Sequence, residues 1–115
     1  MGRVITDTKI DAMYAARAAD PDALGPALGE LVTRGHVPVA AVAGVLNVSE
    51  PTVYRWMLGL ASPRDKDKII KIKKLLVILR KAKRAKELPM AGAMSERIAR
   101  FTTIVKTYRL PALAE

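Results

Sequence analysis

What most constrains the fold of this chain is the segment of residues 39–59, which reads VAAVAGVLNVSEPTVYRWMLG. Its apolar residues recur at helical spacing in two short runs, which predicts two helices separated by a tight turn. Val42, Ala43 and Leu46 share one face of the first helix. Asn47 follows them and tolerates the left-handed backbone conformation that ends a helix abruptly.

The second helix of this segment begins with residues that suit a helix amino terminus. Ser49 can accept a hydrogen bond from the backbone N–H groups that lack partners there, and Pro51 is tolerated in the first turn. Val53 and Trp56 lie three residues apart, so we assign both to the core and not to a base-stacking surface. The exposed side is left to Ser49, Glu50, Tyr54 and Arg55. Two short helices around a tight turn predict a helix-turn-helix.

This segment resembles the lambda-repressor-like (Cro-like, XRE-type) DNA-binding domains of phages and bacteria. Those domains commonly follow the pattern LA…LGVS…TVYRW…G…P. The matching positions are Val42, Ala43, Leu46, Asn47, Val48, Ser49, Thr52, Val53, Tyr54, Arg55, Trp56, Gly59 and Pro63. The chain departs from the family at Asn47, where glycine is usual, and at Pro38, where a serine or threonine cap is usual. The resemblance covers about a third of the chain.

The resemblance implies that the second helix is a recognition helix, whose amino-terminal part enters the major groove of DNA. The residues that it implies as DNA contacts are Ser49, Glu50, Pro51, Thr52, Tyr54 and Arg55. Arg55 suits a guanine or a phosphate, and Glu50 suits the amino group of cytosine. Tyr54 can donate a hydrogen bond to a phosphate, whereas Thr52 can do the same or cap the helix.

Two helices are predicted before the motif, one over residues 6–19 and one over residues 21–34. The second starts either at its first residue or only at Pro26, because an internal proline removes a hydrogen bond and kinks a helix. Gly35 is well suited to end it. The apolar face expected to pack across the motif consists of Leu24, Leu28 and Leu31.

A long, basic, amphipathic helix is predicted over residues 64–86, starting near Ser62 or Pro63. Its apolar stripe comprises Ile69, Ile72, Leu76 and Leu79, widened by Leu75 and Ala82. Residues 64–87 hold eleven basic and three acidic residues, and so supply +8 of the formal net charge of +9. Such clustered charge favours a polyanionic partner.

This basic helix has three interpretations. First, it contacts DNA phosphates and gives salt-dependent affinity without sequence preference. The residues that we assign to this contact are Arg64, Lys66, Lys68, Lys81, Lys83 and Arg84. Second, and compatibly, its apolar stripe pairs with another protomer. Third, and least favoured, it lies on an anionic membrane surface.

A last helix is predicted from a cap at Ser95 to about Tyr108. Its apolar stripe comprises Ile98, Phe101, Val105 and Tyr108. We therefore expect an all-α bundle of five to six helices. It divides into an N-terminal helical extension (1–19), a helix-turn-helix domain with the basic helix (20–87) and a C-terminal helix for oligomerisation or packing (88–115).

Composition argues against several classes of function. The chain has no cysteine, and its one histidine, His36, has no cluster of partners, so we expect no metal site and no cofactor. We find no catalytic set, and Gly25, Gly29 and Gly35 suit helix ends or close packing better than a phosphate-binding loop. We therefore expect that the protein is not an enzyme. No signal peptide and no apolar run of about 20 residues is evident, so we expect a soluble, cytoplasmic protein without membrane contact, in the host cytoplasm or nucleoid if phage-encoded.

The sequence thus favours a sequence-specific, double-stranded DNA-binding protein, namely a phage or bacterial transcriptional regulator. We expect a homodimer, because two recognition helices about 34 Å apart would contact successive major grooves. One alternative is a DNA-recognition subunit for phage packaging, similar to small terminase subunits, which would form a ring. The other alternative is a phage factor that binds host RNA polymerase.

Overall fold

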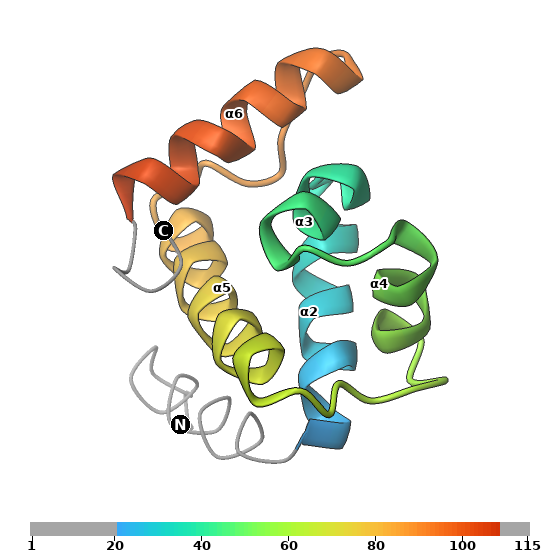
Figure 1. The fold of residues 1–115 in the computed structure, drawn as a ribbon. Coiled ribbons are helices and arrows are strands. Elements are labelled where there is room, and N and C mark those ends of the chain that lie inside the picture. Colours follow the sequence, from blue (N-terminus) through green and yellow to red (C-terminus); the bar gives the residue numbers. More distant parts are fainter. Residues whose placement is uncertain (1–20, 109–115) are drawn as a thin grey trace, which may run out of the picture.

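The computed structural model describes residues 21–108, which form five α-helices and no strand (Figure 1). In chain order these helices are α2 (Pro21–Gly35), α3 (Val39–Leu46), α4 (Glu50–Met57), α5 (Lys66–Arg84) and α6 (Met94–Thr107). The predicted all-α fold is therefore confirmed. The helix predicted over residues 6–19 and the tail after Tyr108 lie outside the described residues.

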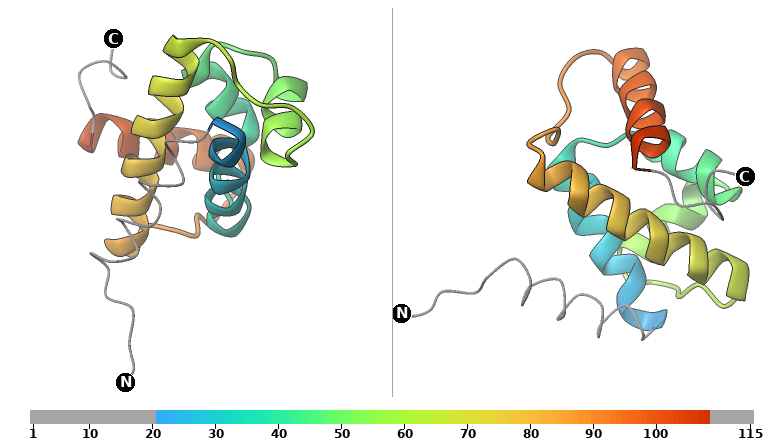
Figure 2. Two further views of the ribbon diagram at one scale, coloured as in Figure 1. Left: turned by 90° about the horizontal axis from the view of Figure 1, so that it is seen from below. Right: turned by 90° about the vertical axis from the view of Figure 1, so that its left-hand side faces the viewer.

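Helix α2 is the centre of the fold, with α4 packed on one side and α5 on the other (Figures 1 and 2). Leu24 and Leu28 are fully buried there, as the predicted apolar face requires. Two glycines of α2 face α4. A Cβ on Gly25 would overlap the backbone carbonyl of Trp56, and one on Gly29 would lie 2.9 Å from the carbonyl oxygen of Met57. The glycines thus allow the backbones of α2 and α4 to approach closely, as expected for close packing.

The two ends of α2 differ in part from the prediction. The helix begins at Pro21 and runs through Pro26, so a start at Pro26 is wrong. The ring of Pro26 lies on the exposed side of the helix, where it does not interrupt core packing. The helix ends at Gly35, as predicted, but His36 is the residue with the positive φ, at 55°. The Val37 N–H donates to the Val32 carbonyl at 3.0 Å, which closes the last turn in the manner of a Schellman motif.

Helix α5 begins later than predicted, because Asp65 is its cap and Ser62 and Pro63 are not. The Asp65 carboxylate accepts a hydrogen bond from the Asp67 N–H at 2.8 Å. The buried residues of the helix are Ile72, Leu75, Leu76, Ile78, Leu79 and Ala82. The predicted stripe is therefore confirmed in most positions. It differs in that Ile69 is only half-buried and Ile78 is buried, so the apolar face is wider.

Helix α6 lies across α3 and α5 (Figure 1). The prediction of a Ser95 cap is wrong: the cap position is Ala93, whose N–H donates to the Glu96 carboxylate at 2.8 Å. Phe101 and Val105 are buried as predicted, whereas Ile98 is exposed. Ile98 belongs to the first turns of the helix, and the buried positions follow it at Phe101, Ile104 and Val105.

The segment between α5 and α6 is anchored to the end of α2. The Met90 N–H donates to the Gly35 carbonyl at 2.8 Å, and the Met90 side chain is buried. The Arg97 guanidinium donates to the His36 carbonyl at 3.1 Å. Residues of α6 and of the helix-turn-helix belong to the same core cluster, so one apolar core holds all five described helices together.

Candidate nucleic-acid interface

The turn between α3 and α4 has the conformation that the sequence predicts. Asn47 has φ 57° and ψ 48°, in the left-handed region. This conformation directs the Val48 N–H to the Ala43 carbonyl at 3.0 Å and the Asn47 N–H to the Gly44 carbonyl at 3.2 Å. The last carbonyls of α3 are thereby satisfied, and the chain is free to start α4 in a new direction.

Helix α4 is capped by the serine that the sequence assigns to that position. The Ser49 Oγ accepts a hydrogen bond from the Thr52 N–H at 3.3 Å, and the two hydroxyl oxygens lie 2.9 Å apart. Pro51 occupies the first turn. Since both hydroxyls are engaged with each other, Ser49 and Thr52 shape the amino terminus of α4 and have less capacity to contact a ligand.

One side of α4 anchors the helix to the core. Val53 is fully buried, and Trp56 is only 7% exposed. Trp56 is therefore a core residue, as predicted, and not a stacking surface. Its backbone carbonyl is the group that Gly25 of α2 contacts most closely. Because this side of α4 is held against the core, the opposite side of the helix must face outward.

That opposite side carries four of the six predicted DNA contacts. Glu50, Pro51, Tyr54 and Arg55 are all exposed. Within residues 21–108, no hydrogen bond or ion pair ties the side chain of Glu50, Tyr54 or Arg55 to another residue. Their donors and acceptors are therefore available to an external partner at no cost in internal bonds.

The start of α5 comes close to this helix-turn-helix. The Lys68 Nζ donates to the Asn47 carbonyl at 3.4 Å, which links α5 to the turn. Arg64 and Lys66 precede Lys68 by a few residues and are exposed. We call Arg64, Lys66 and Lys68 the motif-side group. Its cations lie at the edge of the helix-turn-helix, where DNA phosphates would flank an inserted α4.

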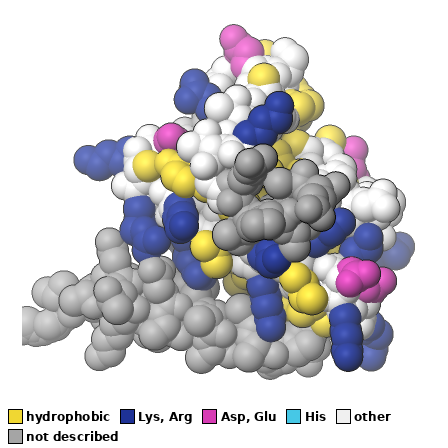
Figure 3. All heavy atoms as spheres, turned by 60° about the vertical axis from the view of Figure 1, so that its left-hand side comes forward, with side chains coloured by type: hydrophobic (Ala, Val, Ile, Leu, Met, Phe, Trp, Pro, Cys, Tyr) yellow, Lys and Arg dark blue, Asp and Glu magenta, His cyan; other side chains and the backbone are white. Residues whose placement is uncertain are grey.

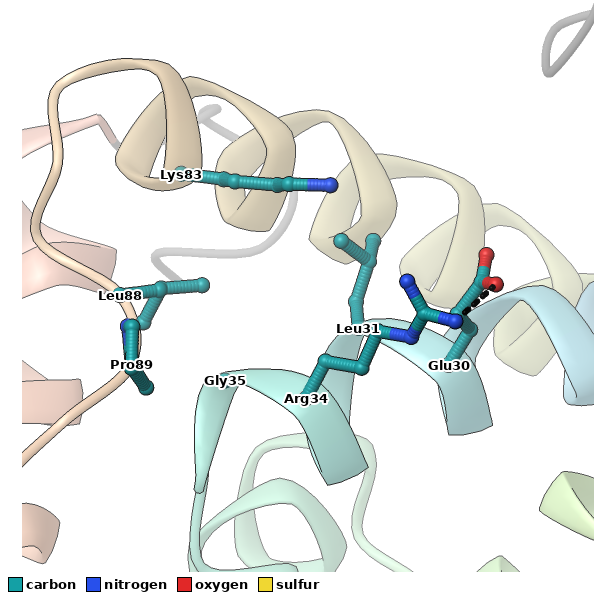
Figure 4. A pocket seen from close by; sticks show the side chains of 7 residues that line it. All are labelled: Glu30, Leu31, Arg34, Gly35, Lys83, Leu88 and Pro89. Atoms are coloured by element: carbon teal, nitrogen blue, oxygen red, sulfur yellow. Dashed lines mark ion pairs between the residues drawn. The ribbon is translucent and has the colours of Figure 1, made fainter.

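The other three predicted phosphate contacts do not join the motif-side group. With a rise of about 1.5 Å per residue, Lys81 lies about 20 Å beyond Lys68 along α5. Lys83 turns toward α2 and lines a small cavity beside Leu31 and Arg34 (Figure 4). We call Lys81, Lys83 and Arg84 the distal group. Seen from the α5 side, Lys and Arg dominate the charged side chains of the surface (Figure 3).

The structure also identifies exposed residues that the sequence interpretation missed. Leu58 is 70% exposed and Leu60 is 75% exposed, directly after α4. The signal was present in the sequence, because Leu58 follows Tyr54 by four residues and so lies on the exposed side of the helix.

Residues 21–108 also bear on two other kinds of site. That part of the chain holds no group of three or more His, Cys, Asp or Glu residues placed to bind a metal ion. None of its helices is both long and apolar enough to span a bilayer. The candidate site of this structure is the exposed side of α4 together with the motif-side group.

Comparison with known proteins adds no relative. The chain matches no protein-family model, no curated protein and no solved structure. The resemblance in residues 39–59 consequently rests on the motif residues themselves.

Proposed function

We propose that this chain is a sequence-specific, double-stranded DNA-binding protein that acts as a transcriptional regulator. The observation that carries the proposal is the α3–α4 unit. A left-handed Asn47 and a Ser49 cap set the direction of α4, and two buried residues hold it. Helix α4 has eight residues, so it is about 12 Å long. An α-helix with its side chains is about 10–12 Å across, and the major groove, about 12 Å wide, admits a helix of this diameter.

The exposed side chains of α4 have separate roles in this proposal. Arg55 donates to a guanine edge, and Glu50 accepts from a cytosine amino group. Tyr54 donates its hydroxyl to a phosphate. Ser49 and Thr52 position these residues through the cap. The motif-side group contacts phosphates beside the groove and supplies salt-dependent affinity.

The proposal includes a homodimer. One α4 offers only three unengaged polar side chains, which is a small surface for reading a site. Two copies about 34 Å apart would read two half-sites in successive major grooves. Sedimentation in the presence of DNA tests this point. A ring of eight or more copies would instead support a DNA-packaging subunit.

The proposal is tested by selecting sites from a pool of random duplexes and measuring the affinity for the selected and scrambled duplexes. We expect a preference that approaches the roughly 10³-fold of specific DNA-binding proteins. Affinity for both duplexes should fall as salt rises, because phosphate contacts release counterions. Equal affinity for selected and scrambled duplexes at every salt concentration would exclude a sequence-specific regulator. A polymerase-binding assay would then test the remaining alternative.

A further inference from the structure

The exposed face of α4 carries an apolar strip between its two charged residues. Successive residues of a helix are about 100° apart. Pro51, Tyr54 and Leu58, at positions i, i+3 and i+7, therefore project in similar directions. Glu50 and Arg55 flank them on opposite sides. Tyr54 is 48% exposed and Leu58 is 70% exposed.

Leu58 of this strip contrasts with the leucines of the helical core, although Leu60, Ile70, Met94 and Ile98 are also exposed elsewhere in the described residues. The leucines of α2 and α5 are buried in one core cluster, whereas Leu58 projects outward from the candidate site. Exposed apolar groups that cluster within a binding face mark the surface that a partner covers. Burial of such a surface is most favourable against apolar groups, so a partner that covers the strip would best offer apolar groups at matching positions.

The surroundings of the strip indicate the chemistry of that partner. Arg55 borders the strip, and Lys68 of the motif-side group is bonded to the turn that precedes α4. These cations are complementary to a polyanion. In the major groove of duplex DNA, the apolar feature of the base edges is the 5-methyl group of thymine.

We infer that the apolar strip recognises thymine through its 5-methyl group, an inference that rests on the proposed function. Pro51 and Leu58 are seven residues apart, which corresponds to about 10 Å along the helix axis. Because base pairs are about 3.4 Å apart, the strip spans about three base pairs. The bound site therefore contains thymines opposite the strip, bordered by a base that Arg55 contacts.

The test replaces each thymine of the selected site, one at a time, by deoxyuridine, which lacks only the methyl group. At a contacted position we expect about a fourfold loss of affinity, which corresponds to the burial of one methyl group. Thymines elsewhere in the site should tolerate the replacement.

Variants of the protein then assign the contact. In Leu58→Ala, replacement of the thymine opposite Leu58 should cause no further loss. Leu60→Ala is the matched control, because this leucine is 75% exposed but does not belong to the strip, and its response to uracil should equal that of the wild type. Pro51→Ala provides a second test at the other end of the strip. Circular dichroism establishes that each variant is folded.

Two results would overturn the inference and leave DNA binding intact. In the first, the uracil-containing sites bind as tightly as the thymine site at every position. In the second, the loss of affinity on replacement of thymine by deoxyuridine is the same in Leu58→Ala, Pro51→Ala and Tyr54→Ala as in the wild type. The methyl group would then act through DNA shape and not through the strip. If no site can be selected at all, the proposed function fails, and the inference fails with it.

Discussion

Gly25 of α2 and Trp56 of α4 are in backbone contact, so close that any side chain at residue 25 would overlap the Trp56 carbonyl. This contact places α4 directly on the central helix. Val53 and Trp56 can then be buried while the opposite side of α4 stays exposed. The orientation of the candidate recognition face thus depends on a residue with no side chain.

The first prediction concerns this contact. Gly25→Ala should lower the free energy of unfolding by about 2 kcal/mol or more, because α2 and α4 must move apart to admit the methyl group. Urea unfolding followed by the fluorescence of Trp56, the only tryptophan, measures the change. Gly44→Ala is the control, since a Cβ there meets nothing within 4 Å. It should raise stability by about 0.5–1 kcal/mol through helix propensity. Equal effects of the two changes would contradict the packing described for α2 and α4.

A second prediction separates the two serines that the sequence assigns as helix caps. Ser49→Ala should cost about 1 kcal/mol of stability, because the Thr52 N–H loses its acceptor. Ser95→Ala should cost less than about 0.5 kcal/mol, the usual limit for a surface position, because Glu96 supplies the acceptor for the start of α6. Chemical denaturation of the two variants under the same conditions makes the comparison. A larger loss for Ser95→Ala would show that the caps are assigned wrongly.

Local signals explain what the sequence predicts well. Asn47, Ser49 and Pro51 act within a few residues of the helix end that each one defines, so their roles follow from nearest neighbours. The burial of Val53 and Trp56 follows from their helical spacing and from the motif that they belong to. Sequence reasoning places the start of α6 at the wrong residue because a serine is a common cap, whereas here a glutamate side chain accepts from the backbone of Ala93.

Tertiary contacts explain what the sequence does not predict. Gly25 and Gly29 suggest close packing, but nothing local identifies α4 as the helix that they contact. The separation of the motif-side group from the distal group is likewise not predictable from the sequence. A row of basic residues gives no indication of which end of α5 contacts the turn. The bond from Lys68 to the Asn47 carbonyl, 21 residues away, decides that question.

The third prediction concerns alkaline pH. The pKa of Tyr108 is raised above 10.0 by partial burial, and further by the negative charge of Glu87 and a hydrogen bond to it. The folded protein therefore holds this proton more tightly than the unfolded chain. The resulting stabilisation is complete below pH 10 and is lost as the pH rises through the raised pKa. Tyr108→Phe has no phenol proton and therefore lacks this pH-dependent stabilisation. The difference in the free energy of unfolding between wild type and variant should be constant below about pH 10 and should change, with the wild type losing stability, only above it. A difference that varies between pH 7 and 9 would contradict this origin.

A fourth prediction compares two double substitutions, each of which removes two lysines and therefore the same charge. Lys66→Ala/Lys68→Ala removes two cations beside the turn, and Lys81→Ala/Lys83→Ala removes two at the far end of α5. The slope of log affinity against log salt should fall by about 2 in the first variant, or about 0.9 for each lost phosphate contact, and by less in the second. Fluorescence anisotropy with a labelled duplex gives both slopes. If the second pair changes the slope more, the distal group is the principal phosphate-binding surface.

The measurement that tests the central claim most directly compares Arg55→Ala with Arg100→Ala. Both arginines are exposed, but Arg55 lies on α4 and Arg100 lies on α6, which packs against α3 and α5. The quantity measured is the ratio of affinities for the selected and scrambled duplexes, at one salt concentration. Loss of a base contact costs about 1–3 kcal/mol, so Arg55→Ala should lower the ratio about fivefold or more. Arg100→Ala should leave it unchanged. An unchanged ratio in Arg55→Ala, or an equal fall in both variants, would contradict sequence recognition by α4.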